Sequence, residues 1–167
     1  MKKVALIFAV SAAAFAAGKL EVLGPDVRYR AVTLSPGESR LFKVPDVERI
    51  TANSGTCLEE SLDTEEEHTL VITAKCGGVR TSMVWRANGT RIQMLACAED
   101  EKSTPAAKKL RAKLQGELKA YKMVTACARY GRVELLGWVD SQADVEKLTT
   151  LAAKNDADDK VELLGQE

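Results

Sequence analysis

The apolar residues of this chain change their period once, at a polar stretch of residues 99–105. Before this stretch, apolar and polar residues alternate in short runs, which is typical of half-buried β-strands. After it, Ala107, Leu110, Leu114 and Leu118 recur at steps of three and four, which is typical of one face of a helix. We therefore predict two small domains joined by a linker, with boundaries at residues 22–98, 99–105 and 106–167.

The first of these domains is predicted to be all β. Residues 69–74 are rich in β-branched side chains and are closed by Cys76-Gly77-Gly78, which predicts a strand. Asn88-Gly89 is typical of a hairpin turn, and Pro36-Gly37 predicts another tight turn. Strands that recur about every 8–12 residues with regular turns indicate a small β-sandwich.

The second domain is predicted to have the order α-β-β-α-β. Ser103 or Thr104 can cap the first helix, with Pro105 in its first turn. Two alternating segments and a second helix follow, and the last strand is expected over residues 160–164. This order predicts a small α+β fold with two helices on one face of a three-stranded sheet.

The first eighteen residues have the architecture of a secretory signal peptide. Lys2 and Lys3 precede a short apolar run, and Ala14-Phe15-Ala16 is an A-x-A cleavage pattern. The apolar run is shorter than the ~20 residues that span a bilayer, so we expect cleavage near Ala16–Gly18 rather than an anchor. The predicted location is the periplasm, with a possible association with the outer membrane.

Four cysteines follow the predicted cleavage site: Cys57, Cys76, Cys97 and Cys127. An even number in an oxidising compartment predicts disulfides, although four cysteines allow three pairings and the sequence does not choose among them. No C-x-x-C pair is present and the spacings do not fit a zinc site, so no metal is expected.

One face of the second domain's sheet is predicted to be apolar without a helix to cover it. Strand alternation places Val133, Leu135 and Val139 under the helices and leaves another set on the opposite face. Either a separate partner binds there, or the β-domain packs there, with Cys97 bonded to Cys127 as one possibility. The candidate partner-binding residues are Met123, Thr125, Leu136, Trp138 and Leu164, and Cys127 shares their face.

The first helix of the second domain carries five basic side chains on its polar face. They could contact lipid head groups or an acidic partner, or they could simply be solvated. These residues are Lys108, Lys109, Arg111, Lys113 and Lys119.

The sequence offers little for catalysis or cofactor binding. The one histidine, His68, follows three glutamates in a polar connection, and we expect it to be solvated. No phosphate-binding loop or nucleophile motif is present, and 24 basic residues balance 24 acidic ones, which disfavours nucleic-acid binding. We expect a non-enzymatic protein with no catalytic residue, no cofactor and no small-molecule substrate.

Two groups of motifs resemble the N-terminal region of pilus-assembly secretins of the Tad/Cpa type. The first half resembles their pilus-formation N-terminal domain, and the second half resembles a BON domain, whose core pattern is V-x-L-x-G-x-V. The matching segments are Leu34-Ser35-Pro36-Gly37-Glu38-Ser39, Phe42-Lys43-Val44-Pro45, Val47-Glu48-Arg49-Ile50, Leu70-Val71-Ile72-Thr73-Ala74-Lys75, Val84-Trp85, Asn88-Gly89, Val133-Glu134-Leu135-Leu136-Gly137-Trp138-Val139 and Val161-Glu162-Leu163-Leu164.

The resemblance implies a structural or interaction module of a Tad pilus or type II-like secretion system. Such a module would dock on a secretin or another envelope component. Because the chain ends at Glu167, we expect no pore domain of the kind that follows these modules in secretins. BON domains are associated with phospholipid, which implies an envelope-maintenance role as the alternative.

Overall fold

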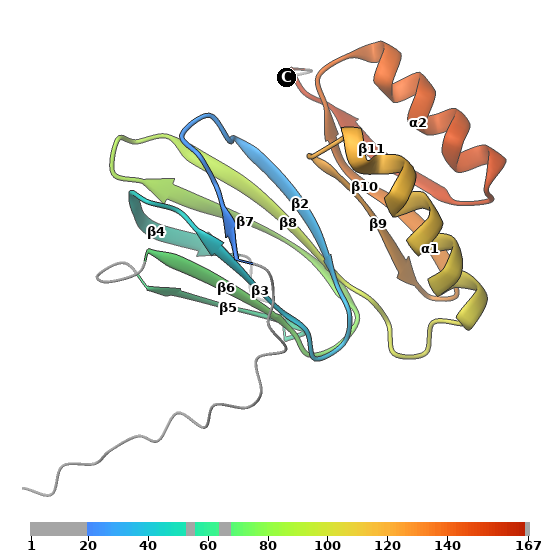
Figure 1. Cartoon of the computed structure of the whole chain (residues 1–167), viewed down its shortest axis with the longest axis horizontal. Helices are drawn as coiled ribbons and strands as arrows, with labels where there is room; N and C mark the ends of the chain where they lie inside the picture. Colours follow the sequence, from blue (N-terminus) through green and yellow to red (C-terminus); the bar gives the residue numbers. More distant parts are fainter. Residues whose placement is uncertain (1–19, 53–55, 64–67, 166–167) are drawn as a thin grey trace, which may run out of the picture.

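The computed structural model describes residues 20–52, 56–63 and 68–165. The predicted signal peptide, residues 1–18, lies outside them. Within the described residues, eleven strands form three mixed sheets, and two α-helices cover one of these sheets (Figure 1).

The first sheet has the strand order β1-β3-β6-β5. Its strand β1 lies at an edge and runs parallel to β3, and the other pairs are antiparallel. The strands are β1 (Glu21–Val22), β3 (Ser39–Lys43), β5 (Leu58–Asp63) and β6 (Thr69–Ala74).

The second sheet has the strand order β2-β8-β7-β4 and packs on the first sheet. The core between these two sheets includes Phe42, Ile72, Val84 and Ile92, each with 1% or less of its surface exposed. The strands are β2 (Tyr29–Leu34), β4 (Val47–Ala52), β7 (Gly78–Arg86) and β8 (Arg91–Ala98).

The third sheet has the strand order β11-β10-β9 and carries the helices on one face. Helix α1 begins after its N-cap Thr104, whose side chain accepts a hydrogen bond from the Ala107 N–H, and Ser141 caps α2 in the same way. The elements are α1 (Pro105–Glu117), the 3-10 helix η1 (Leu118–Ala120), β9 (Val124–Arg129), β10 (Arg132–Val139), α2 (Gln142–Lys154) and β11 (Asp158–Leu163).

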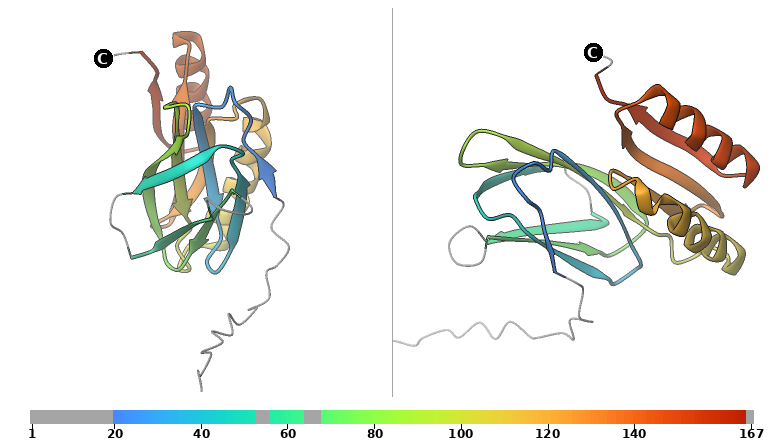
Figure 2. Two further views of the ribbon diagram at one scale, coloured as in Figure 1. Left: turned by 90° about the vertical axis from the view of Figure 1, so that its left-hand side faces the viewer. Right: turned by 45° about the horizontal axis from the view of Figure 1, so that its top comes forward.

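The other face of the third sheet packs on the second sheet, and this contact joins the two halves of the chain. Tyr29 and Ala31 of β2 and Leu95 of β8 meet Leu136 and Trp138 of β10. The rings of Tyr29 and Trp138 are 5.3 Å apart at their centroids. Four layers follow one another: first sheet, second sheet, third sheet and helices (Figure 2).

This layering overturns the fold class predicted from the sequence. A small all-β sandwich followed by an α+β BON-like domain is wrong, because the described chain is mostly β and contains three mixed sheets. Many of the individual strands and both helices lie close to where the periodicity placed them, but the sequence analysis did not specify β1 and β2. The outward face of β2 and β8 is apolar enough to pack on the third sheet, and strand alternation alone does not show which faces meet.

Gly137 in β10 lies against the backbone of the neighbouring strand. A Cβ added at Gly137 would lie 2.0 Å from the Met123 carbonyl oxygen, and its φ is +134°, a value that side chains disfavour. The close approach lets the Trp138 N–H donate to the Met123 carbonyl at 2.9 Å.

Candidate interaction groove

The sheet face that the sequence analysis proposed as a partner-binding surface is buried in the structure. Trp138 and Leu136 are each 6% exposed, and Thr125 is 2% exposed. Leu136 and Trp138 belong to the cluster between the second and third sheets, and Met123 and Leu164 pack against it. Thr125 forms a hydrogen bond with Thr33 of the second sheet. Of the two alternatives left open by the sequence, the structure shows the second: the first half of the same chain covers this face, with Cys97 bonded to Cys127. The assignment of this face to a separate partner is therefore corrected.

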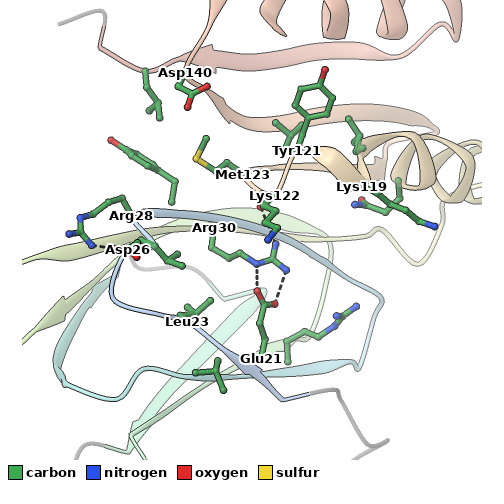
Figure 3. Close-up of a pocket in the computed structure, with 18 of the residues that line it drawn as sticks. Glu21, Leu23, Asp26, Arg28, Arg30, Lys119, Tyr121, Lys122, Met123 and Asp140 are labelled. Carbon is green, nitrogen blue, oxygen red and sulfur yellow. Dashed lines mark hydrogen bonds and ion pairs between the residues drawn. The ribbon is translucent and has the colours of Figure 1, made fainter.

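A groove of about 1310 Å³ opens where the two halves meet (Figure 3). One wall consists of β1 and the segment that leads from it into β2. The other wall consists of α1, η1 and the segment that follows them. The lining residues that the argument below uses are Val22, Arg28, Arg30, Lys119, Lys122 and Met123.

The buried side chain of Arg86 holds the first wall in place. Its guanidinium donates to the Pro25 carbonyl at 2.5 Å and also to the carbonyls of Gly24 and Leu23. Arg86 has 1% of its surface exposed, and its charge lies 3.6 Å from Asp46. Three carbonyls on one planar guanidinium restrict the loop between β1 and β2 to one conformation.

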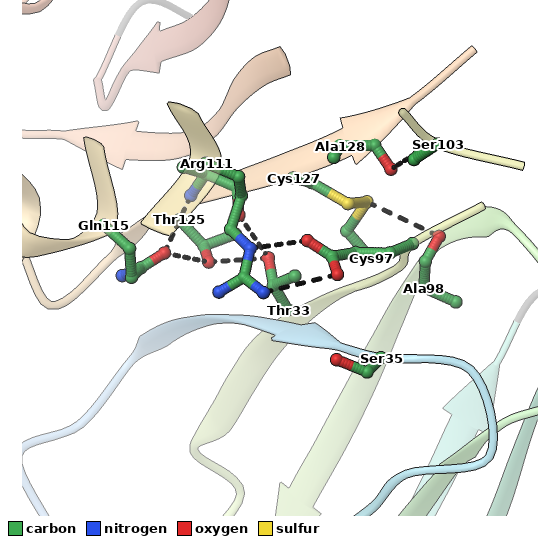
Figure 4. Close-up of polar contacts among 12 residues, drawn as sticks. Thr33, Ser35, Cys97, Ala98, Ser103, Arg111, Gln115, Thr125, Cys127 and Ala128 are labelled. Atoms are coloured by element: carbon green, nitrogen blue, oxygen red, sulfur yellow. Dashed lines mark hydrogen bonds and ion pairs between the residues drawn. A yellow bond between two sulfur atoms is a disulfide. The ribbon is translucent and has the colours of Figure 1, made fainter. Parts of the chain in front are cut away.

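Polar contacts fix the second wall to the first half (Figure 4). Thr33 of β2 and Thr125 of β9 share a hydrogen bond of 2.8 Å, and the Gln115 side chain of α1 accepts from the Ala126 N–H at 3.0 Å. The carboxylate of Glu99, which is 2% exposed, pairs with Arg111 of α1 at 2.6 Å. These contacts connect both halves and α1 in one network, so the width of the groove is set by packed structure.

A disulfide between Cys97 and Cys127 crosses the same interface, and a second one joins Cys57 and Cys76 within the first half. Cys97 and Cys127 are fully buried between the second and third sheets. The predicted disulfides are confirmed, with a pairing that the sequence left open. The stretch 99–105, predicted to be a linker, is anchored here by the Asp100 N–H and the Ser103 hydroxyl, which both donate to the Ala128 carbonyl.

The charges along the groove are unevenly distributed. Several of its cations already have carboxylate partners: Arg30 forms a two-point pair with Glu21 at 2.8 Å, and Arg111 pairs with Glu99. Lys119 and Lys122 are exposed and, among the described residues, have no carboxylate partner. Figure 3 shows them on the α1 side, whereas Asp26 and Arg28 lie toward the other end.

The five basic residues predicted on the first helix fall into two groups. Arg111 and Lys119 line the groove, and Arg111 is half-buried in its ion pair with Glu99. The other three, Lys108, Lys109 and Lys113, are exposed outside the groove, where Lys113 donates to the Asn155 side chain at 3.0 Å. The sequence pattern treated them as one set because it could not show where the first half would lie.

Other candidate sites contribute little. His68, expected to be solvated, is half-buried, and its carbonyl accepts a hydrogen bond from the Val44 N–H at 2.8 Å. In the part of the chain that the structure describes, no three His, Cys, Asp or Glu side chains gather in a way that could hold a metal ion. No helix among residues 20–52, 56–63 and 68–165 is long and apolar enough to cross a membrane.

Glu134 forms a buried ion cluster near the start of β10. It accepts from Arg129 of β9 at 2.8 Å and from Lys160 of β11, so it ties the three strands together. Burial raises the pKa of Glu134, but the hydrogen bonds and charges of Lys160 and Arg129 outweigh this effect and hold the pKa below the ordinary value of 4.5.

We expect Glu134 to make part of the protein's stability dependent on pH. Because its pKa is lower in the folded state, the unfolded chain takes up this proton at the higher pH. The stabilisation is therefore present above about pH 4.5 and is lost as the pH falls through the folded-state pKa. We expect the free energy of unfolding, measured with urea, to fall less between about pH 6 and about pH 3 in Glu134→Gln than in the wild type.

The control for this prediction is Glu162→Gln, which changes an exposed carboxylate on β11. In this variant the free energy of unfolding should fall at acid pH by about as much as in the wild type. A fall in Glu134→Gln as large as in the wild type would contradict the stabilising role of ionised Glu134.

The sequence analysis missed the residues of the first wall. The sequence analysis specified no strand before residue 34, so Arg28 and Arg30 were not considered as site residues. Their alternation with Val27, Tyr29 and Ala31 was the available signal, because it places cations on one side of a strand with an apolar other side.

Comparisons with known proteins leave the family open. No family model matches the sequence, and no curated protein matches it. Among solved structures, the chain is similar to a 2,6-sialyltransferase from a Photobacterium species of the Vibrionaceae, with a TM-score of 0.28 and 12% identity. The alignment covers 84% of this chain but 30% of that one, so the chain spans under a third of the enzyme's length.

Proposed function

We propose that this chain is a non-enzymatic interaction module of the periplasm, which docks on a secretin or another component of a Tad pilus or type II-like secretion system. The sequence motifs that resemble the N-terminal region of Tad/Cpa secretins support this proposal. The two disulfides support an oxidising location outside the cytoplasm.

The observation that carries the proposal is the groove between the two halves. Its walls come from segments about 90 residues apart in sequence, and Arg30 of β2 reaches across to donate to the Lys122 carbonyl at 3.4 Å. The Cys97–Cys127 disulfide and the Thr33–Thr125 hydrogen bond hold the halves together beside it. A rigid concave surface loses little conformational entropy when a partner binds, which favours a docking role.

Photo-crosslinking in the producing cell tests this function. A photoreactive amino acid at Tyr121, which lines the groove, should crosslink to a secretin or to another protein of a pilus or secretion assembly. The matched control places the same probe at Glu146, an exposed position on α2 away from the groove, and should give no such product. Crosslinks from Tyr121 only to proteins outside such assemblies would overturn the proposal.

The second candidate function is binding to phospholipid in an envelope-maintenance role. It is favoured by Lys108, Lys109 and Lys113, which are exposed on α1 outside the groove. In this case the protein would float with vesicles of anionic lipid at low salt and release them at high salt. Reversing the charge of these three lysines would then abolish flotation, and an absence of flotation by the wild type would remove the candidate.

A further inference from the structure

We infer that the groove binds an extended segment of a partner protein that carries acidic side chains, and that Lys119, Lys122 and the free edge of β1 recognise this segment. This inference names the chemistry of the partner and rests on the docking function proposed above.

The free edge of β1 favours an extended segment. Within the described residues, β1 has a neighbour on one side only, the parallel strand β3. The Leu23 N–H donates to the Lys43 carbonyl at 2.9 Å, so the alternation of backbone groups directs the N–H and carbonyl of Val22 away from β3. Val22 also lines the groove, so a segment lying there meets a backbone donor and acceptor that no strand within the described residues pairs.

Apolar side chains provide contacts for alternate residues of such a segment. Leu20 and Val22 are 52% and 60% exposed at the β1 side of the groove. Met123 and Leu164 line it from the second half, where both are half-buried. An extended chain places every second side chain on the same face, so it can present apolar residues to this floor and polar residues to the basic side.

The positive charges at the α1 side of the groove favour acidic side chains in the part of the segment that lies there. Lys119 and Lys122 lie there without carboxylate partners among the described residues, next to the guanidiniums of Arg30 and Arg111. Those guanidiniums are held by Glu21 and Glu99, so on the α1 side the lysines are the cations available to a ligand. Arg28 lines the groove toward the other end, where Asp26 and Asp140 also line it and offset its charge, so the excess of positive charge lies on the α1 side (Figure 3).

The size of the groove favours a peptide over a small molecule. Sites for single small ligands occupy roughly 300–1,000 Å³. The groove measures about 1310 Å³ and extends over both halves of the chain. A strand-like segment of about five or six residues, roughly 17–20 Å long, is an occupant that can contact both halves of the chain at once.

Fluorescence anisotropy with three labelled peptides of about eight residues tests the inference. The peptides alternate valine with glutamate, valine with threonine, and valine with lysine. The glutamate peptide should bind the mature protein most tightly, the lysine peptide least tightly, and high salt should weaken the binding of the glutamate peptide. Equal binding of all three peptides would overturn the inference.

Two variants locate the binding. Lys119→Glu with Lys122→Glu should weaken the glutamate peptide about tenfold or more, because two attractive contacts become repulsive. The matched control, Lys109→Glu with Lys113→Glu, makes the same charge change on α1 outside the groove and should leave binding within about twofold. Equal losses in both variants would show nonspecific attraction and would contradict the site.

The backbone contribution is tested at Val22. Val22→Pro removes the outward N–H and leaves the Leu23 N–H that pairs with β3, so it should weaken the binding of the peptide about threefold to tenfold. Val22→Thr keeps the outward donor and should bind the peptide like the wild type. If the protein binds phosphatidylglycerol vesicles but not the glutamate peptide, and the vesicle binding is lost in the Lys119→Glu, Lys122→Glu variant, the groove is a lipid site and the inference is overturned. Displacement of the peptide by inorganic phosphate alone at equal concentration would reduce the site to an anion site and overturn it as well.

Failure of this inference is distinguishable from failure of the proposed function. If Tyr121 crosslinks to a secretin component but none of the peptides binds, the docking function stands and the acidic partner segment is wrong. If the glutamate peptide binds as described but no pilus or secretion protein is crosslinked, the site stands and the proposed cellular role is wrong.

Discussion

Replacing Gly137 by alanine is expected to destabilise the protein by about 3 kcal/mol or more. The new Cβ would lie 2.0 Å from the Met123 carbonyl oxygen and 2.9 Å from the Val124 Cα, which are backbone atoms and cannot rotate away. The backbone φ of +134° adds a strain that alanine does not tolerate. β9 and β10 would have to separate, and this separation would weaken the hydrogen bond from the Trp138 N–H to the Met123 carbonyl.

Urea unfolding followed by circular dichroism measures this loss. The matched control is Gly116→Ala in α1, where an added Cβ meets nothing within 4 Å. Alanine is the better helix former, so this control should stabilise the protein by about 0.5–1 kcal/mol. A Gly137→Ala variant as stable as the wild type would show that the close contact with Met123 does not exist in solution.

Removing the disulfide between the halves, with Cys97→Ala and Cys127→Ala, is expected to cost about 3–4 kcal/mol. The bond closes a loop with a sequence separation of 30 and lies in the cluster that contains Leu136 and Trp138. Without it, the unfolded chain gains conformational freedom, and the buried interface loses two sulfur atoms. The halves should then separate locally at a lower free energy than the whole protein unfolds.

Limited proteolysis within residues 99–104 distinguishes this local opening from global unfolding. These residues are anchored to Ala128 by Asp100 and Ser103, so opening the interface should expose them and accelerate cleavage. The control variant, Cys57→Ala with Cys76→Ala, removes a disulfide of separation 19 within the first half and should cost about 3 kcal/mol. Cleavage accelerated equally in both variants would contradict a separate opening of the interface.

Strand alternation was the most reliable guide to this protein. It placed Val133, Leu135 and Val139 on the helix-covered face and Leu136 and Trp138 on the other face, and the two separate clusters of the structure confirm this division. It left open whether a separate partner or the first half of the chain covers the second face, because the apolar surface of β2 and β8 was not recognised. Tyr29 and Ala31 lie in a segment for which the sequence analysis specified no strand.

The candidate site was accessible from the sequence only in part. Arg111 and Lys119 were recognised as members of a basic helix face, yet the groove also needs Val22, Arg28 and Arg30 from the first half. A groove between two halves is a property of how they pack, and neither half contains it alone. The role of Arg86 was inaccessible for the same reason, because a buried guanidinium inside a strand has no signature in local periodicity.

By itself, the sequence determined the local elements: alternating runs made strands, and the three-and-four spacing after Pro105 made a helix. These features depend on contacts between residues close together in the chain, or on the conformation of a single residue. Only the tertiary structure decided which apolar faces bury each other, which cysteines pair and which cations remain free in the groove. Those outcomes depend on contacts between residues far apart in sequence, where several arrangements bury similar amounts of apolar surface.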